Sequence, residues 1–90
     1  MKAIYLASID ANSGKRAVGV INSAIKSNKT NGVRIISRST DCSSYHFFTG
    51  AEVTVRFEDS YAEVELSGDE DRVMATKSKL LKIVEGLRLS

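Results

Sequence analysis

Cys42 and His46 are the side chains of this sequence with the greatest potential for chemistry, and they lie four residues apart. A thiolate beside an imidazole is typical of a nucleophile with its base, or of two metal ligands. The chain has no other cysteine or histidine. A zinc site needs three or four ligands, and a thiolate enzyme needs a group that orients the imidazole. We therefore predict no catalytic residue, no metal and no cofactor, and we expect that the protein is not an enzyme.

Gly14-Lys15 is placed between an expected strand and an expected helix, as in a phosphate-binding loop. Such a loop requires Ser or Thr directly after the lysine, where this chain has Arg16, so nucleotide hydrolysis is not indicated. The free N–H groups at the helix start, flanked by Lys15 and Arg16, could instead hold a phosphate of RNA. The alternative is that Ser13 or Asn12 simply caps the helix.

The aromatic residues Tyr45, Phe47 and Phe48 follow a short segment that contains Arg34 and Arg38. Aromatic rings beside basic residues can stack on single-stranded bases. They can equally fill the edge of a hydrophobic core.

Composition bounds the class of protein. Ninety residues, of which 42% are hydrophobic, are sufficient for one domain spanning residues 1–90. The single cysteine allows no internal disulfide, and the sequence lacks a signal-peptide pattern, which predicts a cytoplasmic protein. No apolar run approaches the roughly 20 residues that cross a bilayer, so we expect no membrane association.

Charge is unevenly distributed along the chain. Residues 1–50 contain seven Lys/Arg and two Asp, whereas residues 51–90 contain six Lys/Arg and nine Asp/Glu. This asymmetry indicates either a basic patch for an anionic partner or scattered solvated side chains.

The elements that position these residues follow from hydrophobic periodicity. We expect a strand over residues 3–9, either central in a sheet or at a subunit contact, because both of its faces carry apolar residues. A helix over residues 14–28 and a strand over 33–38 follow. Residues 39–50 combine a polar turn with the aromatic cluster and allow a further short strand antiparallel to residues 33–38.

Residues 53–66 predict a β-hairpin with Asp59-Ser60 at its turn. This turn pairs Val53, Val55 and Phe57 with Leu66, Val64 and Ala62 on one face, and it pairs Arg56 with Glu63 and Thr54 with Glu65 on the other. One face of the hairpin is therefore core and the other is exposed to water.

The last helix is expected over residues 69–87, opened by a capping box of Ser67 and Glu70. The acidic run of residues 69–71 suits the positive end of the helix dipole. Its apolar arc spans about 180°, where roughly 100° suffices for one core face. We infer that a second protein chain covers part of this helix.

These elements give the order β-α-β-(β)-β-β-α. The predicted fold is α+β, a two-layer sandwich with two helices on one face of a mostly antiparallel sheet of three to four strands.

The same order of elements resembles the small dimerising subunit of the KEOPS complex, which carries out threonylcarbamoyl-adenosine modification of tRNA. The resemblance rests on the helix beginning Ser13-Gly14-Lys15-Arg16-Ala17-Val18-Gly19-Val20-Ile21, the hairpin Val53–Leu66 and the long final helix. It implies a non-catalytic assembly and dimerisation subunit that pairs with itself or a paralogue, docks on a catalytic tRNA-modification subunit and helps to place tRNA. The implied partner-interface residues are Met74, Leu81, Ile83 and Leu87, and the implied tRNA-backbone residues are Lys15, Arg16, Arg34 and Arg38.

Two alternatives to this role stay open. The charge asymmetry and the aromatic cluster suit an independent RNA- or DNA-binding module. The short length and the lack of catalytic motifs suit a small protein-binding adaptor or inhibitor of the kind that mobile elements encode.

Overall fold

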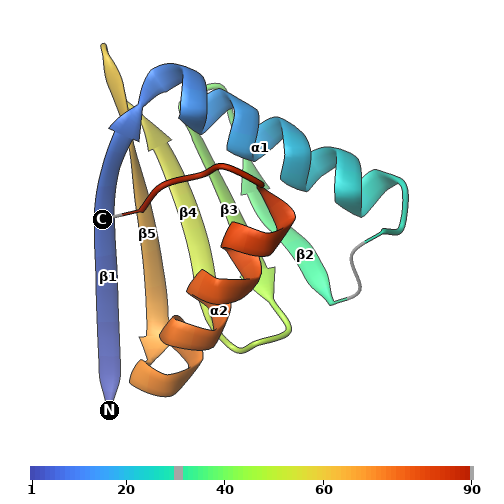
Figure 1. The fold of residues 1–90 in the computed structure, drawn as a ribbon, viewed down its shortest axis with the longest axis vertical. Coiled ribbons are helices and arrows are strands. Elements are labelled where there is room, and N and C mark those ends of the chain that lie inside the picture. The colour runs from blue at the N-terminus through green and yellow to red at the C-terminus, as the bar shows by residue number, and fades with distance from the viewer. Residues whose placement is uncertain (30–31, 90) are drawn as a thin grey trace.

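A computed structural model describes residues 1–29 and 32–89 of the chain. It shows a five-stranded antiparallel sheet with strand order β1-β5-β4-β3-β2, and both helices lie on one face of that sheet (Figure 1). This confirms the α+β class, the element order and the two-layer arrangement. The sheet has five strands where three to four were predicted, because the uncertain segment after residue 38 forms a complete strand.

The first strand, β1, spans Lys2–Asp10, and α1 spans Ala11–Lys26. Helix α1 begins three residues earlier than predicted, and its N-cap is Asp10 rather than Asn12 or Ser13. The Asp10 carboxylate accepts the Ser13 N–H at 3.0 Å and the Ser13 hydroxyl at 2.7 Å. A carboxylate is a strong cap acceptor, so the helix starts directly from the end of the strand.

Strand β2 spans Val33–Arg38 and β3 spans Cys42–Phe47. The two strands pair antiparallel, as the sequence allowed, with a register shift between Ile35 and Ser37. Strand β3 also pairs with β4, so it lies inside the sheet, and β2 forms an edge.

The hairpin consists of β4, Glu52–Phe57, and β5, Tyr61–Asp69. Its register agrees with the prediction at every pair named above. One contact differs: Arg56 forms its ion pair diagonally with Glu65, at 2.9 Å, and not with the directly opposite Glu63.

Helix α2 spans Glu70–Ile83. The predicted capping box is wrong, because Ser67 belongs to β5 and the residue before the helix, Asp69, makes no side-chain cap bond. The predicted end at Leu87 is also wrong. After Ile83 the chain turns through Gly86, at φ +80°, and returns Leu87 to the core.

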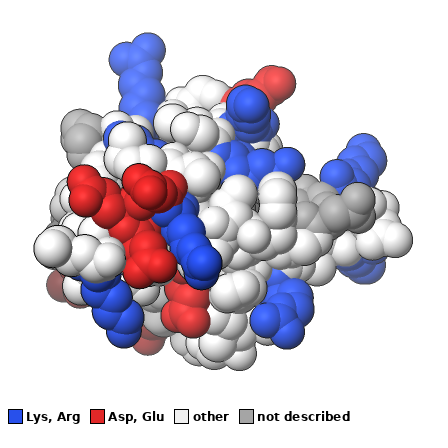
Figure 2. Space-filling model, turned by 90° about the horizontal axis from the view of Figure 1, so that it is seen from below, with Lys and Arg blue, Asp and Glu red and all other residues white. Residues whose placement is uncertain are grey.

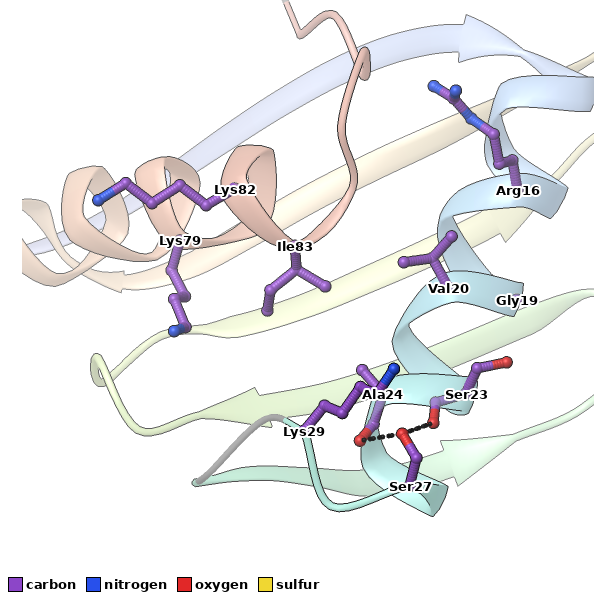
Figure 3. Close-up of a pocket in the computed structure, with 10 residues that line it drawn as sticks. All are labelled: Arg16, Gly19, Val20, Ser23, Ala24, Ser27, Lys29, Lys79, Lys82 and Ile83. Carbon is purple, nitrogen blue, oxygen red and sulfur yellow. Dashed lines mark hydrogen bonds between the residues drawn. The ribbon is translucent and has the colours of Figure 1, made fainter.

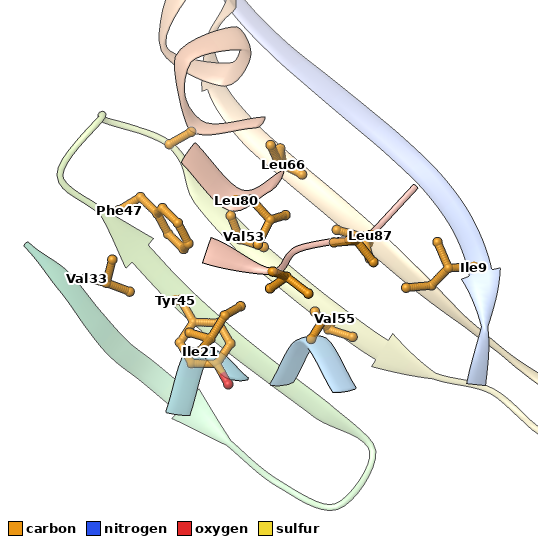
Figure 4. Close-up of a cluster of buried hydrophobic side chains, with 14 of the residues drawn as sticks. Ile9, Ile21, Val33, Tyr45, Phe47, Val53, Val55, Leu66, Leu80 and Leu87 are labelled. Atoms are coloured by element: carbon orange, nitrogen blue, oxygen red, sulfur yellow. The ribbon is translucent and has the colours of Figure 1, made fainter. Parts of the chain in front are cut away.

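The hydrophobic core lies between the sheet and the helices (Figure 4). Val53, Val55 and Leu66 of the hairpin form its floor, and Ile21 of α1 and Leu80 of α2 cover them. Tyr45 and Phe47 of β3 are fully buried in this core.

Candidate interaction surfaces

Strand β1 is an edge strand, so the prediction of a central strand is wrong. Its even-numbered side chains lie on the sheet face that the helices leave uncovered, and there Ile4 is 71% exposed and Leu6 52% exposed. Charged residues and prolines usually protect an edge strand from pairing with another chain. Between Lys2 and Asp10 this strand contains neither. The alternative prediction, a subunit contact, stays open.

The hydrogen-bond pattern shows which backbone groups face outward from this edge. The Glu58 N–H donates to the Tyr61 carbonyl at 2.9 Å, which makes residues 58 and 61 a hydrogen-bonded pair. Because bonded and non-bonded pairs alternate in antiparallel ladders, β5 directs the backbone groups of Ala62, Val64 and Leu66 toward β1. Their partners are the odd-numbered residues of β1. The N–H and C=O groups of Ile4, Leu6 and Ser8 therefore point out of the sheet.

A second surface is the groove between α1 and α2, with a volume of about 730 Å³. Val20 of α1 and Ile83 of α2 face each other across it (Figure 3). Four cationic side chains line it, and no carboxylate does so among the described residues. The cationic residues are Arg16, Lys29, Lys79 and Lys82.

The four cations are distributed along the groove. Arg16 reaches toward the segment that follows α2, where its guanidinium passes close to Gly86. Lys29 and Lys79 lie at the opposite end, and Lys82 points along α2 away from α1 (Figure 3). A groove lined by small, apolar and hydroxyl residues, with cations at both ends, can bind a molecule that carries spaced negative charges.

Phe48 extends this groove. A neighbouring depression shares Lys29 and Lys79 with the groove and adds Gly32 and Phe48. Phe48 is 59% exposed, and the Lys79 ammonium lies over its ring, 5.4 Å from the centroid. Gly32, at φ +80°, lies so close to Phe48 that a β-carbon at this position would collide with the Phe48 Cβ. Phe48 is therefore exposed to solvent while its side chain packs against Gly32.

The acidic side chains at the start of α2 are separated from this surface. Glu70 and Asp71 occupy the first turn of α2, and Asp69 contacts Arg72 at 3.7 Å. Figure 2, a view onto the end of the molecule where α2 begins, shows a cluster of carboxylates on one side, a further carboxylate at the upper edge, and Lys/Arg both beside the cluster and across the rest of the view. The acidic residues are thus unevenly distributed on this face of the molecule, as they are along the sequence.

The structure does not bring the four predicted nucleic-acid-binding residues together. Arg16 lines the interhelical groove, whereas Lys15 lines a separate small depression with Glu58 and Asp59. Arg34 and Arg38 lie on edge strand β2, where they are directly opposite His46 and Ser43 of β3. Only Phe48 of the three aromatic residues is available for stacking, because Tyr45 and Phe47 are buried. At the start of α1, Asp10 already occupies the site considered for a phosphate.

The predicted partner-interface residues also fall in different surroundings. Met74 is 58% exposed on α2. Leu81 and Ile83 are partly buried and pack against the core of the same chain, and Leu87 belongs to that core. Most of the wide apolar arc is therefore covered by the chain itself, and Leu87 is not accessible to a partner.

The strand conformation separates Cys42 from His46. Both side chains are on the uncovered face of β3, four residues apart. At about 3.3 Å per residue their backbones are roughly 13 Å apart, so these two groups cannot act as a nucleophile and base. In addition, no group of three or more His, Cys, Asp or Glu is placed to hold a metal ion within the described part of the chain.

Within residues 1–29 and 32–89, the pKa values of three titratable groups are shifted by their surroundings. Hydrogen bonds from the Ser13 side chain and backbone lower the pKa of Asp10. Burial raises the pKa of Tyr45, whose hydroxyl donates to Asn22 Oδ1 at 2.7 Å. The hydrogen bond to Glu65 raises the pKa of Arg56. These shifts belong to a helix cap, a core contact and a cross-strand ion pair, so each has a structural explanation.

Neither described helix is long and apolar enough to cross a bilayer. Comparison of the chain with protein-family models, curated proteins and solved structures found no match.

Proposed function

We propose that the protein is a non-catalytic assembly subunit that pairs with a second copy of itself along β1. The observation that carries this proposal is the unprotected edge of β1, which presents outward backbone groups beside exposed Ile4 and Leu6. The resemblance to the small dimerising KEOPS subunit implies the same kind of role.

The sequence of β1 is suited to antiparallel pairing about Leu6. A two-fold axis at this residue places Leu6 opposite Leu6, Ile4 opposite Ser8, and Lys2 opposite Asp10 of the second copy. Opposite charges then meet at both ends of the paired strands, and Leu6 and Ile4 of both copies cluster on the uncovered face. The outward N–H and C=O groups gain partners along the whole edge.

Sedimentation equilibrium at micromolar concentration tests this proposal. The wild-type protein is expected to be a dimer, and Leu6→Lys is expected to be a monomer, because it sets two like charges opposite each other at the axis. Met74→Lys is the matched control, since Met74 is equally exposed but lies on α2, and it should stay dimeric. A monomeric wild type would contradict the proposal, as would dissociation by Met74→Lys but not by Leu6→Lys.

A further inference from the structure

We propose that the interhelical groove binds single-stranded nucleic acid, with phosphates held by Arg16, Lys29 and Lys79 and a base stacked on Phe48. This site is distinct from the β1 edge, and the proposal does not depend on self-association. It combines two observations: a groove lined by cations with no carboxylate among its described lining residues, and an exposed aromatic ring at the end of that groove.

The charges favour a polyanion. The groove residues lie on both helices and on the segment that follows α1, so cations face the ligand from two sides. The described lining residues include no carboxylate: Glu70 and Asp71 are at the far end of α2, and Glu85, which precedes Gly86 near the Arg16 end, does not line the groove. A chain of phosphates matches several cations spread along a groove better than a single small anion does.

Phe48 favours a single strand over a duplex or an acidic peptide. Phe48 packs against Gly32, and the Lys79 ammonium lies over its ring, so a phosphate bound by that ammonium would bring its own base to the ring, where the base would take the place of the ammonium. Every base has a face that can stack on an aromatic ring, but the bases of a duplex are already stacked on each other. An acidic peptide offers the charge without the bases.

The test measures binding of a fluorescein-labelled oligouridine of about twelve nucleotides by fluorescence anisotropy over a series of salt concentrations. The double variant Arg16→Gln/Lys79→Gln is expected to lower the affinity strongly. It should also reduce the slope of log K against log salt by about 1.4, since each phosphate contact on a single strand contributes about 0.7.

The matched control is Arg34→Gln/Arg38→Gln, which removes the same charge from edge strand β2, outside the groove. It should leave most of the affinity in place. Phe48→Leu keeps an apolar side chain but removes the stacking face, and it should weaken oligouridine binding about tenfold or more. All of these side chains are exposed or at the rim, and circular dichroism of each variant checks that the fold is retained.

Three results would overturn the proposal. The first is binding that is indifferent to salt, or no binding of oligouridine at low salt. The second is an equal loss in the groove and control double variants, which would indicate a general charge effect. The third is full competition by polyglutamate together with no effect of Phe48→Leu, which would assign the groove to an acidic peptide.

Discussion

Gly14 is a packing residue of α1. A β-carbon at this position would lie 2.7 Å from the Ala62 Cβ and 3.0 Å from the Phe57 ring, so the glycine allows the helix to approach the hairpin closely. Alanine normally stabilises a helix interior by about 1 kcal/mol relative to glycine. At Gly14 this gain is opposed by overpacking against Ala62, which costs about 1–3 kcal/mol in a packed core.

We therefore expect Gly14→Ala to lower the free energy of unfolding by up to about 2 kcal/mol, the cost of overpacking minus the gain in helix propensity. Gly19 provides the control, because it is in the same helix and a β-carbon there meets nothing within 4 Å. Gly19→Ala should raise the free energy of unfolding by up to about 1 kcal/mol. Urea denaturation of both variants measures the two effects, and equal signs would show that the close approach at Gly14 does not control the packing.

Tyr45 and Asn22 join α1 to the middle of the sheet. The Tyr45 hydroxyl is the donor and Asn22 Oδ1 the acceptor, at 2.7 Å. Tyr45→Phe leaves that oxygen without its donor at a partly buried position. We expect the free energy of unfolding to fall by about 1–2 kcal/mol, measured by urea denaturation at neutral pH. No change would mean that water replaces the tyrosine hydroxyl.

The raised pKa of Tyr45 adds a pH dependence to the same contact. In the unfolded chain tyrosine ionises near pH 10, whereas burial keeps the folded-state hydroxyl protonated to higher pH. Stability from this group is therefore complete below about pH 10 and is lost as pH rises above it. Tyr45→Phe should show a smaller alkaline loss of stability than the wild type. Equal losses would assign the alkaline transition to other groups.

At the scale of the whole molecule, the two proposed surfaces are compatible with each other. Antiparallel pairing of β1 with its copy continues the sheet, so side chains of paired residues share a face. The helices of both copies, and with them both grooves, then lie on the same side of a ten-stranded sheet. One long nucleic-acid strand can in that case contact two grooves.

This arrangement predicts avidity. An oligouridine several times longer than one groove should bind the wild-type dimer about a hundredfold more tightly than the short oligomer does. The Leu6→Lys monomer should show little such gain. Anisotropy titrations with both lengths measure the difference, and an equal gain for monomer and dimer would contradict the shared orientation of the grooves.

The register of the hairpin was predictable to the residue because its information is local. Alternating apolar residues on both sides of Asp59-Ser60 specify the turn, the register and the buried face together. Both helices were located, but their ends were not. The cap of α1 is supplied by Asp10, the last residue of a strand, and α2 stops early because Leu87 returns to the core.

The candidate surfaces were less predictable because they depend on which strands become neighbours. The sequence of residues 2–10 does not show that β5 pairs with one side of this strand. It also does not show that no described strand pairs with the other side. The groove had a partial signal: Arg16, Val20 and Ala24 recur every four residues and so share one face of α1. That signal does not show that Lys79 and Ile83 of α2 lie across the groove from these α1 residues.

The pairing of β1 with β5 also constrains the order in which the fold assembles. The first strand of the chain cannot pair until the last strand is available, since Lys2 pairs with Asp69 and Asp10 pairs with Tyr61. Until β5 has been synthesised, Ile4 and Leu6 belong to a strand without a neighbour on either side. Contacts so distant in sequence form slowly, so we expect β1, whose outer edge we propose for self-association, to join the sheet last. The interval before closure is when a wrong neighbour competes with β5 for the same backbone groups.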